Sequence, residues 1–361
     1  MRIQVVDTIY PEAAAQVYRQ TPGLVGAPYA VQRQALWSAF FGTSDAYVHH
    51  LAELGHYTDG VLLNCWPLQS AWAREHRIPA RAVLSRRGRR AGPSPLAHQL
   101  VLLAQVRSFR PDVLFVNDPL RLGDAVLRRL RAAGVFLVGQ LASTPPPDRR
   151  LARYDLMLSS FPHFVSEWRS HGIEAEHFQL GFYERIAEQV ETAPDAPRRS
   201  GVVLIGGLSP ATYPTVTPML EELCAAVDVD VWGYAERELP RHSPIRRRFH
   251  GSAWGLDMYR HMARAAIVVN RHGDIARGYA NNMRLFEATG VGAAVLTEAA
   301  PNLHEMFEPE AEMATYSSGE ELVAKVQRLL DDDAARVALA AAGQRRTLAD
   351  HTYAERMREL A

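Results

Sequence analysis

The sequence of 361 residues contains a single lysine, Lys325, although lysine and arginine together number 40. This scarcity argues against chemistry that depends on a lysine, such as a phosphate-binding P-loop or a Schiff base. There are also only two cysteines, Cys65 and Cys224, which lie far apart in apolar contexts. So few cysteines form neither a disulfide framework nor a metal-ligand spacing, and a reducing compartment is the simpler expectation.

Net charge and long apolar runs are missing as well. Basic and acidic residues number 40 each, so the formal net charge is zero, which argues against a general nucleic-acid binder. No stretch approaches 18 uninterrupted apolar residues, and the first residues resemble a strand rather than a signal peptide. We therefore expect a cytoplasmic protein without a transmembrane segment. The basic run at 86–90 is interpreted as a solvated loop, with an anionic membrane or polymer contact as the alternative.

Short apolar runs alternate along the chain with longer amphipathic segments. This alternation indicates βαβ units, in which parallel sheets are covered by helices on both faces. The predicted strands are 3–7, 60–64, 80–84, 113–117, 135–140, 156–159, 202–206, 229–233, 266–270, 293–297 and 313–316. The predicted helices include 46–54, 69–75, 95–109, 123–133, 162–171, 320–330, 334–349 and 351–360. The fold class is therefore α/β.

A polar, proline-bearing stretch at 184–200 is typical of a linker and divides the chain into halves of similar size. We predict two doubly wound, Rossmann-like domains, 1–183 and 201–361, that face each other across a cleft. The last helix is expected to pack back on the N-terminal domain. In such sheets, ligands bind beyond the carboxyl ends of the strands.

Paired glycines, Gly206 and Gly207, follow a predicted strand of the second domain. Glycines at such a turn let backbone N–H groups approach a phosphate closely. The signal is weak by itself, since a tight turn without any ligand is the commoner role of a Gly-Gly pair.

The region after the strand at 266–270 carries a more specific pattern. Asn281 or Asn282 would begin a helix, and Arg284 and Glu287 would then share one face of its first turns. An arginine near the positive end of a helix suggests a bound anion. A glutamate can accept hydrogen bonds from two hydroxyl groups, such as those of a ribose diol. An exposed Arg–Glu pair, worth a few tenths of a kcal/mol, is an equally good explanation of this spacing.

Candidate proton acceptors lie in the first domain. Asp45 follows Gly42, Thr43 and Ser44 at a helix start, where it could act as a general base for a sugar hydroxyl or simply cap the helix. His163 lies at another crossing from strand to helix, and Asn117 follows a strand. Each of these residues is a candidate by position only.

The stretch from Asn270 to Glu359 resembles the C-terminal domain of bacterial CgeB-like glycosyltransferases, the spore-maturation and glycosyl-transferase-1-like group. The resemblance is carried by Asn270-Arg271-His272, by the segment 280–290 with its Glu-Ala-Thr-Gly, by Glu305-Met306-Phe307-Glu308, and by Gly343-Gln344-Arg345-Arg346 and His351-Thr352-Tyr353. The N-terminal half is similar to relatives among surface-polysaccharide enzymes through segments such as 41–45, 64–69 and 159–164.

The resemblance implies a GT-B fold and transfer of a sugar from a nucleotide diphosphate donor in the C-terminal domain. In similar enzymes the glutamate of the Glu-Ala segment binds the nucleotide ribose, which falls on Glu287. Many retaining relatives carry an arginine and a lysine shortly after the glycine turn, and this chain does not. We therefore assign the leaving diphosphate to Arg284, helped by Arg271, with His272 and Asn282 in the same pocket.

We expect no cofactor, and no Asp-x-Asp metal motif is apparent, so a helix dipole and an arginine would replace a divalent cation. The expected partners are a nucleotide-sugar donor and a glycan, lipid-linked, protein or small-molecule acceptor. Two alternatives stay open: a nucleotide-sugar epimerase on the same fold, and a non-catalytic protein that binds nucleotide-sugars. The donor base, the sugar, the acceptor and the stereochemical outcome do not follow from the sequence.

Overall fold

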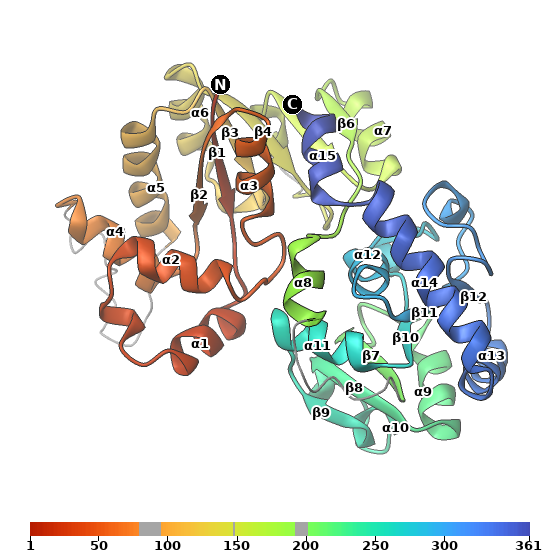
Figure 1. Ribbon diagram of the computed structural model, residues 1–361. Coiled ribbons are helices and arrows are strands. Elements are labelled where there is room, and N and C mark those ends of the chain that lie inside the picture. The colour runs from red at the N-terminus through yellow and green to blue at the C-terminus, as the bar shows by residue number, and fades with distance from the viewer. Residues whose placement is uncertain (79–94, 147–148, 192–200) are drawn as a thin grey trace. The chain divides into compact units, whose positions relative to one another are not determined.

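The computed structural model describes residues 1–78, 95–146, 149–191 and 201–361, which fold into two compact units (Figure 1). Unit 1 consists of Met1–Gln179 and Met357–Ala361, and unit 2 consists of Leu180–Arg356. The expected strand at 80–84, the basic run at 86–90 and the part of the expected linker at 192–200 lie outside the described residues. No helix of the described ranges is both long enough and apolar enough to cross a bilayer.

Unit 1 contains a six-stranded sheet in the order β2-β1-β3-β4-β5-β6, in which every pairing is parallel. Its strands are β1 (Arg2–Asp7), β2 (Tyr57–Leu62), β3 (Val113–Val116), β4 (Phe136–Gln140), β5 (Leu156–Ser159) and β6 (Ala175–His177). Its helices are α1 (Pro11–Gln20), α2 (Tyr29–Trp37), α3 (Ala46–Glu53), α4 (Trp66–Glu75), α5 (Pro95–Phe109), α6 (Asp124–Ala132) and α7 (Pro162–Ser170).

Unit 2 contains a second parallel sheet, in the order β12-β11-β10-β7-β8-β9. Its strands are β7 (Val202–Gly207), β8 (Val229–Tyr234), β9 (Phe249–Gly251), β10 (Ile267–Asn270), β11 (Ala294–Glu298) and β12 (Ala314–Tyr316). Its helices are α8 (Arg185–Glu191), α9 (Thr217–Ala226), α10 (Pro244–Arg247), α11 (Leu256–Arg264), α12 (Met283–Gly290), α13 (Gly319–Asp331) and α14 (Asp333–Asp350). Helix α15 (Tyr353–Leu360) contains the boundary between the units, since Met357–Ala361 belongs to unit 1.

The core of unit 2 explains why its strands are almost uninterrupted apolar runs. Alternate residues of the central strands, such as Val202 and Leu204 of β7, pack in one cluster with apolar residues of α9 and α13. The residues between them, Val203 and Ile205, are also buried. A strand that is buried on both faces needs no polar positions, which is the pattern that a parallel sheet between two helical layers requires. The predicted α/β class with two doubly wound sheets is confirmed.

In each sheet there is one place where successive strands stop being added on one side of the first strand and continue on its other side. In unit 2 this switch point lies between β7 and β10, and in unit 1 it lies between β1 and β3. Helices that leave neighbouring strands on opposite faces open a crevice at the carboxyl ends of those two strands, where ligands bind in folds of this class. The switch points therefore direct attention to the residues that follow β7, β10, β1 and β3.

Two kinds of element were not expected from the sequence. Strands β6 and β9 have three residues each and lie at sheet edges with exposed residues, so they lack the apolar runs by which the other strands were recognised. The first part of the expected linker at 184–200 forms helix α8 instead. Glu188 and Gln189 are exposed while Ile186 and Val190, four residues apart, are buried, so the polar pattern belongs to an amphipathic helix.

Candidate functional site

The glycine pair and an arginine meet at the switch point of unit 2. Gly206 and Gly207 end β7, and Arg271 directly follows β10, the neighbouring strand. The Nη2 atom of Arg271 donates a hydrogen bond to the carbonyl oxygen of Gly207. Gly206 has a φ of 155°, a backbone conformation that disfavours a side chain, and a Cβ atom there would lie 3.6 Å from Arg271 Nη2. The backbone of β7 therefore runs close beside the guanidinium.

Arg271 is an almost completely buried cation, with 6% of its surface exposed. Its guanidinium lies 4.3 Å from the centre of the Tyr213 ring. In the part of the chain that the structure describes, no carboxylate lies within ion-pair distance of it, and its Nε has no hydrogen-bond partner. Burial lowers the pKa of the Arg271 guanidinium, because the charged form is poorly solvated there. A buried charge with no carboxylate at ion-pair distance is unfavourable, and Glu298 attracts this one only from farther away, so the position favours the binding of an anion.

His272 continues the loop and is held as a neutral imidazole. Its backbone N–H donates to Glu298 Oε2 at 2.6 Å, and its Nε2 lies 3.3 Å from Thr297 Oγ1 at the end of β11. Burial lowers the pKa of His272 to about 4, so the ring carries no charge at neutral pH. The same burial raises the pKa of the Glu298 carboxyl group. His272 thus offers the site hydrogen bonds rather than charge.

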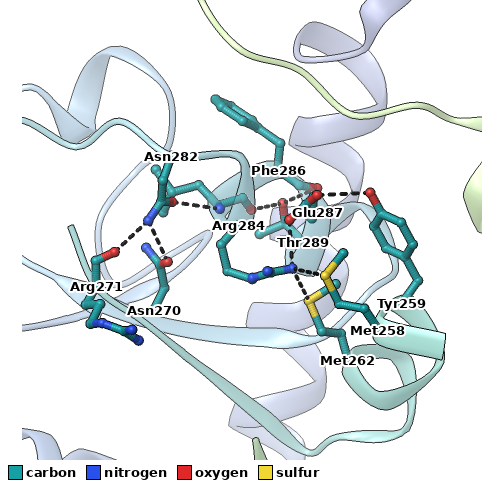
Figure 2. A network of polar contacts seen from close by, with 11 residues as sticks. Met258, Tyr259, Met262, Asn270, Arg271, Asn282, Arg284, Phe286, Glu287 and Thr289 are labelled. Carbon is teal, nitrogen blue, oxygen red and sulfur yellow. Dashed lines mark hydrogen bonds and ion pairs between the residues drawn. The ribbon is translucent and has the colours of Figure 1, made fainter. Parts of the chain in front are cut away.

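Asn282 ties the start of α12 to the end of β10 (Figure 2). Its Oδ1 accepts a hydrogen bond from the backbone N–H of Leu285 at 3.3 Å, which confirms Asn282 as the N-cap of the helix. Its Nδ2 donates to Asn270 Oδ1 at 2.9 Å and to the carbonyl oxygen of Arg271 at 2.5 Å. One side chain therefore places the helix N-terminus next to the loop that carries Arg271 and His272.

Arg284 and Glu287 form a buried ion pair one turn into α12 (Figure 2). Arg284 Nη1 lies 2.7 Å from Glu287 Oε2, with 15% and 6% of the two side chains exposed. Tyr259 of α11 donates its hydroxyl hydrogen to Glu287 Oε1 at 3.0 Å, and the sulfur atoms of Met258 and Met262 contact Arg284 Nη1 at 3.1 and 3.3 Å. Burial and the neighbouring Glu287 raise the pKa of the Tyr259 hydroxyl. The alternative of an exposed surface pair is therefore wrong.

Buried polar atoms without partners collect around this loop and helix start. Among the described residues, no protein group forms a hydrogen bond with Arg271 Nε, His272 Nδ1, Arg284 Nε or the side-chain amide of Asn281. Buried polar groups in native proteins are almost always paired, and exceptions call for an explanation such as a bound ligand or water. Most of these atoms are nitrogen atoms that can donate a hydrogen bond, so they suit a ligand rich in acceptor oxygens.

The candidate bases of the first domain lie in unit 1, at the starts of helices α3 and α7. Asp45 occupies the N-cap position of α3 without a capping hydrogen bond from its side chain, and its Oδ1 lies 3.4 Å from Ser44 Oγ. His163 lies in the first turn of α7, which follows β5, with ring centres 5.3 and 4.6 Å from those of Phe161 and Phe164. Strands β3 and β4 separate β5 from β1. The structure thus groups Arg271, His272, Asn282, Arg284 and Glu287 near Gly206 and Gly207, whereas Asp45 and His163 lie at the starts of two different helices of unit 1.

One carboxylate was missed by the sequence analysis. Asp7, the last residue of β1, accepts hydrogen bonds from Thr43 and Asn117, so three segments of unit 1 converge on it. Asn117 had been considered for its position after a strand, and the same signal was available for Asp7, which ends the first predicted strand. Tyr259, the partner of Glu287, was also missed, because it lies on a helix that the sequence analysis did not predict.

The chain does contain Asp-x-Asp sequences, at 228–230 and 331–333, but the structure uses their carboxylates elsewhere. Asp228 pairs with Arg248, and Asp230 Oδ1 lies 2.8 Å from His250 Nε2. Asp332 caps α14, and Asp333 pairs with Arg336. Within the described ranges, one group of three side chains has the closeness of metal ligands: His49, His50 and Glu53 on α3, with ligand atoms within 4.8 Å of one another.

Residues 215–361 match the family described as Glycosyl transferase-like, which is the expected family for the C-terminal part of the chain. No curated protein matches the sequence significantly.

Solved structures resemble the whole chain in fold, at low sequence identity. HepE from Anabaena, in complex with UDP and glucose, has a TM-score of 0.61 at 13% identity over 100% of this chain and 98% of that one. Sucrose-phosphate synthase from Thermosynechococcus elongatus has a TM-score of 0.59 at 14% identity over 100% and 97%. A UDP-N-acetylglucosamine 2-epimerase has a TM-score of 0.50 at 13% identity over 100% and 94%. The chain therefore has the GT-B fold of these proteins.

Proposed function

We propose that the chain transfers a sugar from a UDP-sugar to an acceptor hydroxyl, because residues 215–361 match the glycosyl transferase-like family. The choice of a uridine donor is supported by HepE, which has the same fold and whose structures contain UDP with glucose and UDP-glucose. The site in unit 2 supplies the physical argument, since its groups match the parts of a nucleotide diphosphate.

The observation that carries the proposal is the buried Arg271 beside the glycine pair, for which the described residues supply no carboxylate within ion-pair distance. In this proposal the diphosphate lies at the switch point, against the backbone of Gly206 and Gly207. The Arg271 guanidinium neutralises it there. The N-terminus of α12 and the orphaned donors of Arg271 and Asn281 add hydrogen-bonding groups and a favourable dipole.

Glu287 is proposed to hold the ribose of the donor. A carboxylate has about four lone-pair sites, and Tyr259 and Arg284 occupy two of them, one on each oxygen. Two acceptor sites are left for a diol. Because Arg284 already pairs with Glu287, we assign the diphosphate charge first to Arg271, and we propose that Arg284 mainly holds Glu287 in position. His272 and Asn282 complete the pocket.

The chemical step breaks the bond between the anomeric carbon and the diphosphate oxygen, and UDP leaves with the electron pair. The acceptor oxygen forms the new bond to the anomeric carbon. Negative charge grows on the leaving diphosphate, and positive groups that are already oriented there stabilise it without reorganisation. Since Arg271 and the helix N-terminus supply that charge, we propose that transfer is metal-independent, so that turnover persists in EDTA.

The acceptor side belongs to unit 1 in this proposal, with Asp45 and His163 as the sequence-based candidates for the proton acceptor. The acceptor itself can be a glycan, a lipid-linked sugar, a protein or a small molecule. An epimerase, the alternative suggested by the epimerase with a similar fold, needs no acceptor. Nuclear magnetic resonance of UDP-sugar incubated with enzyme alone distinguishes the two, because only an epimerase converts the donor to a new isomer.

Calorimetric titration with UDP tests the role of Arg271. A hydrogen bond to a charged group contributes about 1.5–3 kcal/mol, so Arg271→Gln is expected to weaken UDP binding about 10- to 150-fold. The matched control is Arg264→Gln, which changes an exposed arginine at the end of α11 and should leave the affinity unchanged. Unchanged UDP affinity in Arg271→Gln would refute the proposed diphosphate site.

Arg284→Ala is expected to abolish transfer and weaken UDP binding, because Glu287 loses the partner that orients it. Circular dichroism and thermal unfolding verify that the variant is folded before its affinity is measured. An unchanged UDP affinity in the folded variant would show that neither Arg284 nor its hold on Glu287 matters for the donor.

A further inference from the structure

The switch point of unit 1 brings a carboxylate and an amide together. Asp7 is the last residue of β1, and Asn117 follows β3, the adjacent strand. Asn117 Nδ2 donates to Asp7 Oδ2 at 3.1 Å. The rule that directs attention to Arg271 in unit 2 thus directs attention to Asp7 in unit 1, with the opposite charge.

Three donors orient the Asp7 carboxylate without saturating it. The backbone N–H of Thr8 donates to Oδ1 at 2.7 Å, and the Thr43 hydroxyl and Asn117 Nδ2 both donate to Oδ2. Since each carboxylate oxygen accepts about two hydrogen bonds, one site on Oδ1 has no partner among the described residues. The residue as a whole is only partly buried.

The loop that carries Thr43 has an unusual backbone. Gly42 has a φ of 59° and Ser44 a φ of 51°, so the residues on both sides of Thr43 are in the left-handed region. Ser44 is not a glycine, and such conformations in other residues are uncommon and persist where surrounding contacts hold them, often at functional sites. The Ser44 hydroxyl donates to the carbonyl oxygen of Trp37 at 2.6 Å, which is one such contact. The loop thereby aims Thr43 at Asp7.

An apolar cavity begins two residues beyond Asp7. It has a volume of about 490 Å³, and its lining includes Ile9, Ala15, Val25, Trp66 and Pro67. Asn64, which also lines the cavity, forms two hydrogen bonds, of 2.9 and 2.8 Å, to the backbone of Ile9. Tyr10, which lies in the sequence between the lining residues Ile9 and Pro11, is 48% exposed, and its ring centre is 5.1 Å from that of Phe41.

We infer that this edge of unit 1 is an acceptor site, in which Asp7 removes the proton from a hydroxyl group whose apolar body occupies the cavity. The inference rests on the proposed function and names the acceptor class that the proposed function leaves open. The volume falls within the range of pockets that bury drug-sized molecules, so the acceptor is a small, amphiphilic alcohol. As its oxygen bonds to the anomeric carbon and UDP departs with the electron pair of the broken bond, the hydroxyl proton passes to Asp7 Oδ1.

The electrostatics of the position suit this role. Burial, with a smaller contribution from the nearby Asp118, raises the pKa of the Asp7 carboxyl group above its ordinary value, although three hydrogen bonds oppose the shift. A base whose pKa lies closer to the working pH accepts a proton more effectively. Asp45, the candidate from the sequence, lies two residues from Thr43 in the same loop, and the experiments separate the two carboxylates.

The first experiment tests the cavity with two probes that share one head group. Octyl β-glucoside and methyl β-glucoside offer the same sugar hydroxyls with a long and a short apolar tail, and each is titrated calorimetrically into the full-length protein. Octyl glucoside, below its micellar concentration, is expected to bind at least tenfold more tightly. Ala15→Trp, which fills the cavity, should abolish that preference, whereas the matched Ala52→Trp on the exposed face of α3 should retain it.

The second experiment tests the base, with UDP-glucose as donor and octyl glucoside as acceptor. Asp7→Asn is expected to lower kcat at least 100-fold, within the range for general bases, while the affinities for UDP and octyl glucoside change less than threefold. The control Asp155→Asn changes another partly buried aspartate of unit 1, which lies ahead of β5 and pairs with Arg131, and it should keep kcat within threefold. A folded Asp7→Asn variant with full turnover, or a loss confined to Asp45→Asn, overturns the assignment of Asp7.

The outcomes separate this inference from the proposed function. If UDP binds but octyl glucoside does not bind, or binds no better than methyl glucoside, the acceptor site is wrong and the donor site stands. If octyl glucoside binds in the cavity and UDP does not bind, the proposed function fails first, and the transfer role of Asp7 fails with it. If Ala15→Trp keeps the wild-type preference for octyl glucoside over methyl glucoside, the assignment of the cavity is also overturned.

Discussion

The two switch points of this protein have the same backbone construction and opposite chemistry. In unit 2, the switch point between β7 and β10 contains a buried arginine, paired glycines and hydrogen-bond donors that have no partner among the described residues. In unit 1, the switch point between β1 and β3 contains a carboxylate, an amide and a hydroxyl group, and an apolar cavity lies near it. One scaffold thus suits an anion at one site and a neutral hydroxyl compound at the other.

The comparison teaches that the sheet topology chooses the place and the side chains choose the ligand. A switch point is a crevice whatever residues line it, because it arises where helices leave for opposite faces of the sheet. Its charge depends on a few residues immediately after the strands, which the fold does not constrain.

The buried pair on α12 should give the largest effect. Glu287→Ala leaves the Arg284 guanidinium buried against two methionine sulfurs, and removal of one partner of a buried ion pair costs about 3–5 kcal/mol. We expect the free energy of unfolding in urea to fall by that amount. Glu287→Gln, whose amide oxygen can still accept from Tyr259, should lose less. A loss below about 1 kcal/mol in Glu287→Ala would mean that the pair is solvated in solution.

His272 should make the stability of the protein depend on pH. Its ordinary pKa of 6.5 describes the unfolded chain, whereas burial lowers the pKa to about 4 in the folded protein. Between these values the unfolded state binds more protons, so the free energy of unfolding falls as pH falls from about 7 to about 4. The contribution of His272 is about 3 kcal/mol, from about 1.4 kcal/mol for each pKa unit.

The measurement is the difference between wild type and His272→Gln in urea denaturation at several pH values. The subtraction removes the contributions of other buried histidines, such as His351, whose pKa is also lowered by burial. Parallel stability curves for the two proteins would contradict the burial of His272 as a neutral ring.

In unit 1, the pH dependence should appear in the rate. Because Asp7 acts as a base only when ionised, and burial raises its pKa, kcat should increase with pH on the acid side through a value above the ordinary one for aspartate. Asp118 is the charged neighbour that contributes to this shift, so Asp118→Asn should move the rise to lower pH. A rise that persists unchanged in Asp7→Asn would belong to another group and would remove the contrast between the two switch points.

The smallest effect is expected at an exposed pair with the same spacing as Arg284 and Glu287. Asp257 and Arg260 of α11 also lie three residues apart, 3.0 Å from each other, but 42% and 43% of their side chains are exposed. Solvent screens such pairs, so Arg260→Ala should change the free energy of unfolding by less than about 0.5 kcal/mol. A loss comparable with that in Glu287→Ala would show that spacing rather than burial determines the strength of these pairs.

Much of the fold could be predicted because buried parallel strands leave a clear pattern in the sequence. The runs at 202–206 and 266–270 are apolar on both faces and correspond to β7 and β10. The short edge strands β6 and β9 could not be predicted in this way, because one exposed face and three residues produce no periodic pattern. Helix α8 was mistaken for a linker because its apolar residues are few.

The site was predictable where neighbours in sequence are also neighbours in space. Asn282 as the cap of α12, and Arg284 and Glu287 on one face of it, follow from the geometry of a helix. Glycines at 206 and 207 were suggestive for the same local reason. The predictions of Asp45 and His163 as bases remain predictions, since position after a turn says little about what a side chain contacts.

Local patterns in the sequence specify the fold class, the number of sheets and the helix that carries Arg284 and Glu287, because hydrophobic periodicity and helix caps are local properties. Long-range packing buries this pair, places Arg271 beside Gly207 with no carboxylate of the described residues at ion-pair distance, and makes Thr43 and Asn117 converge on Asp7. Those facts depend on the order of strands in each sheet, which joins residues 64 and 110 positions apart and which no local pattern encodes.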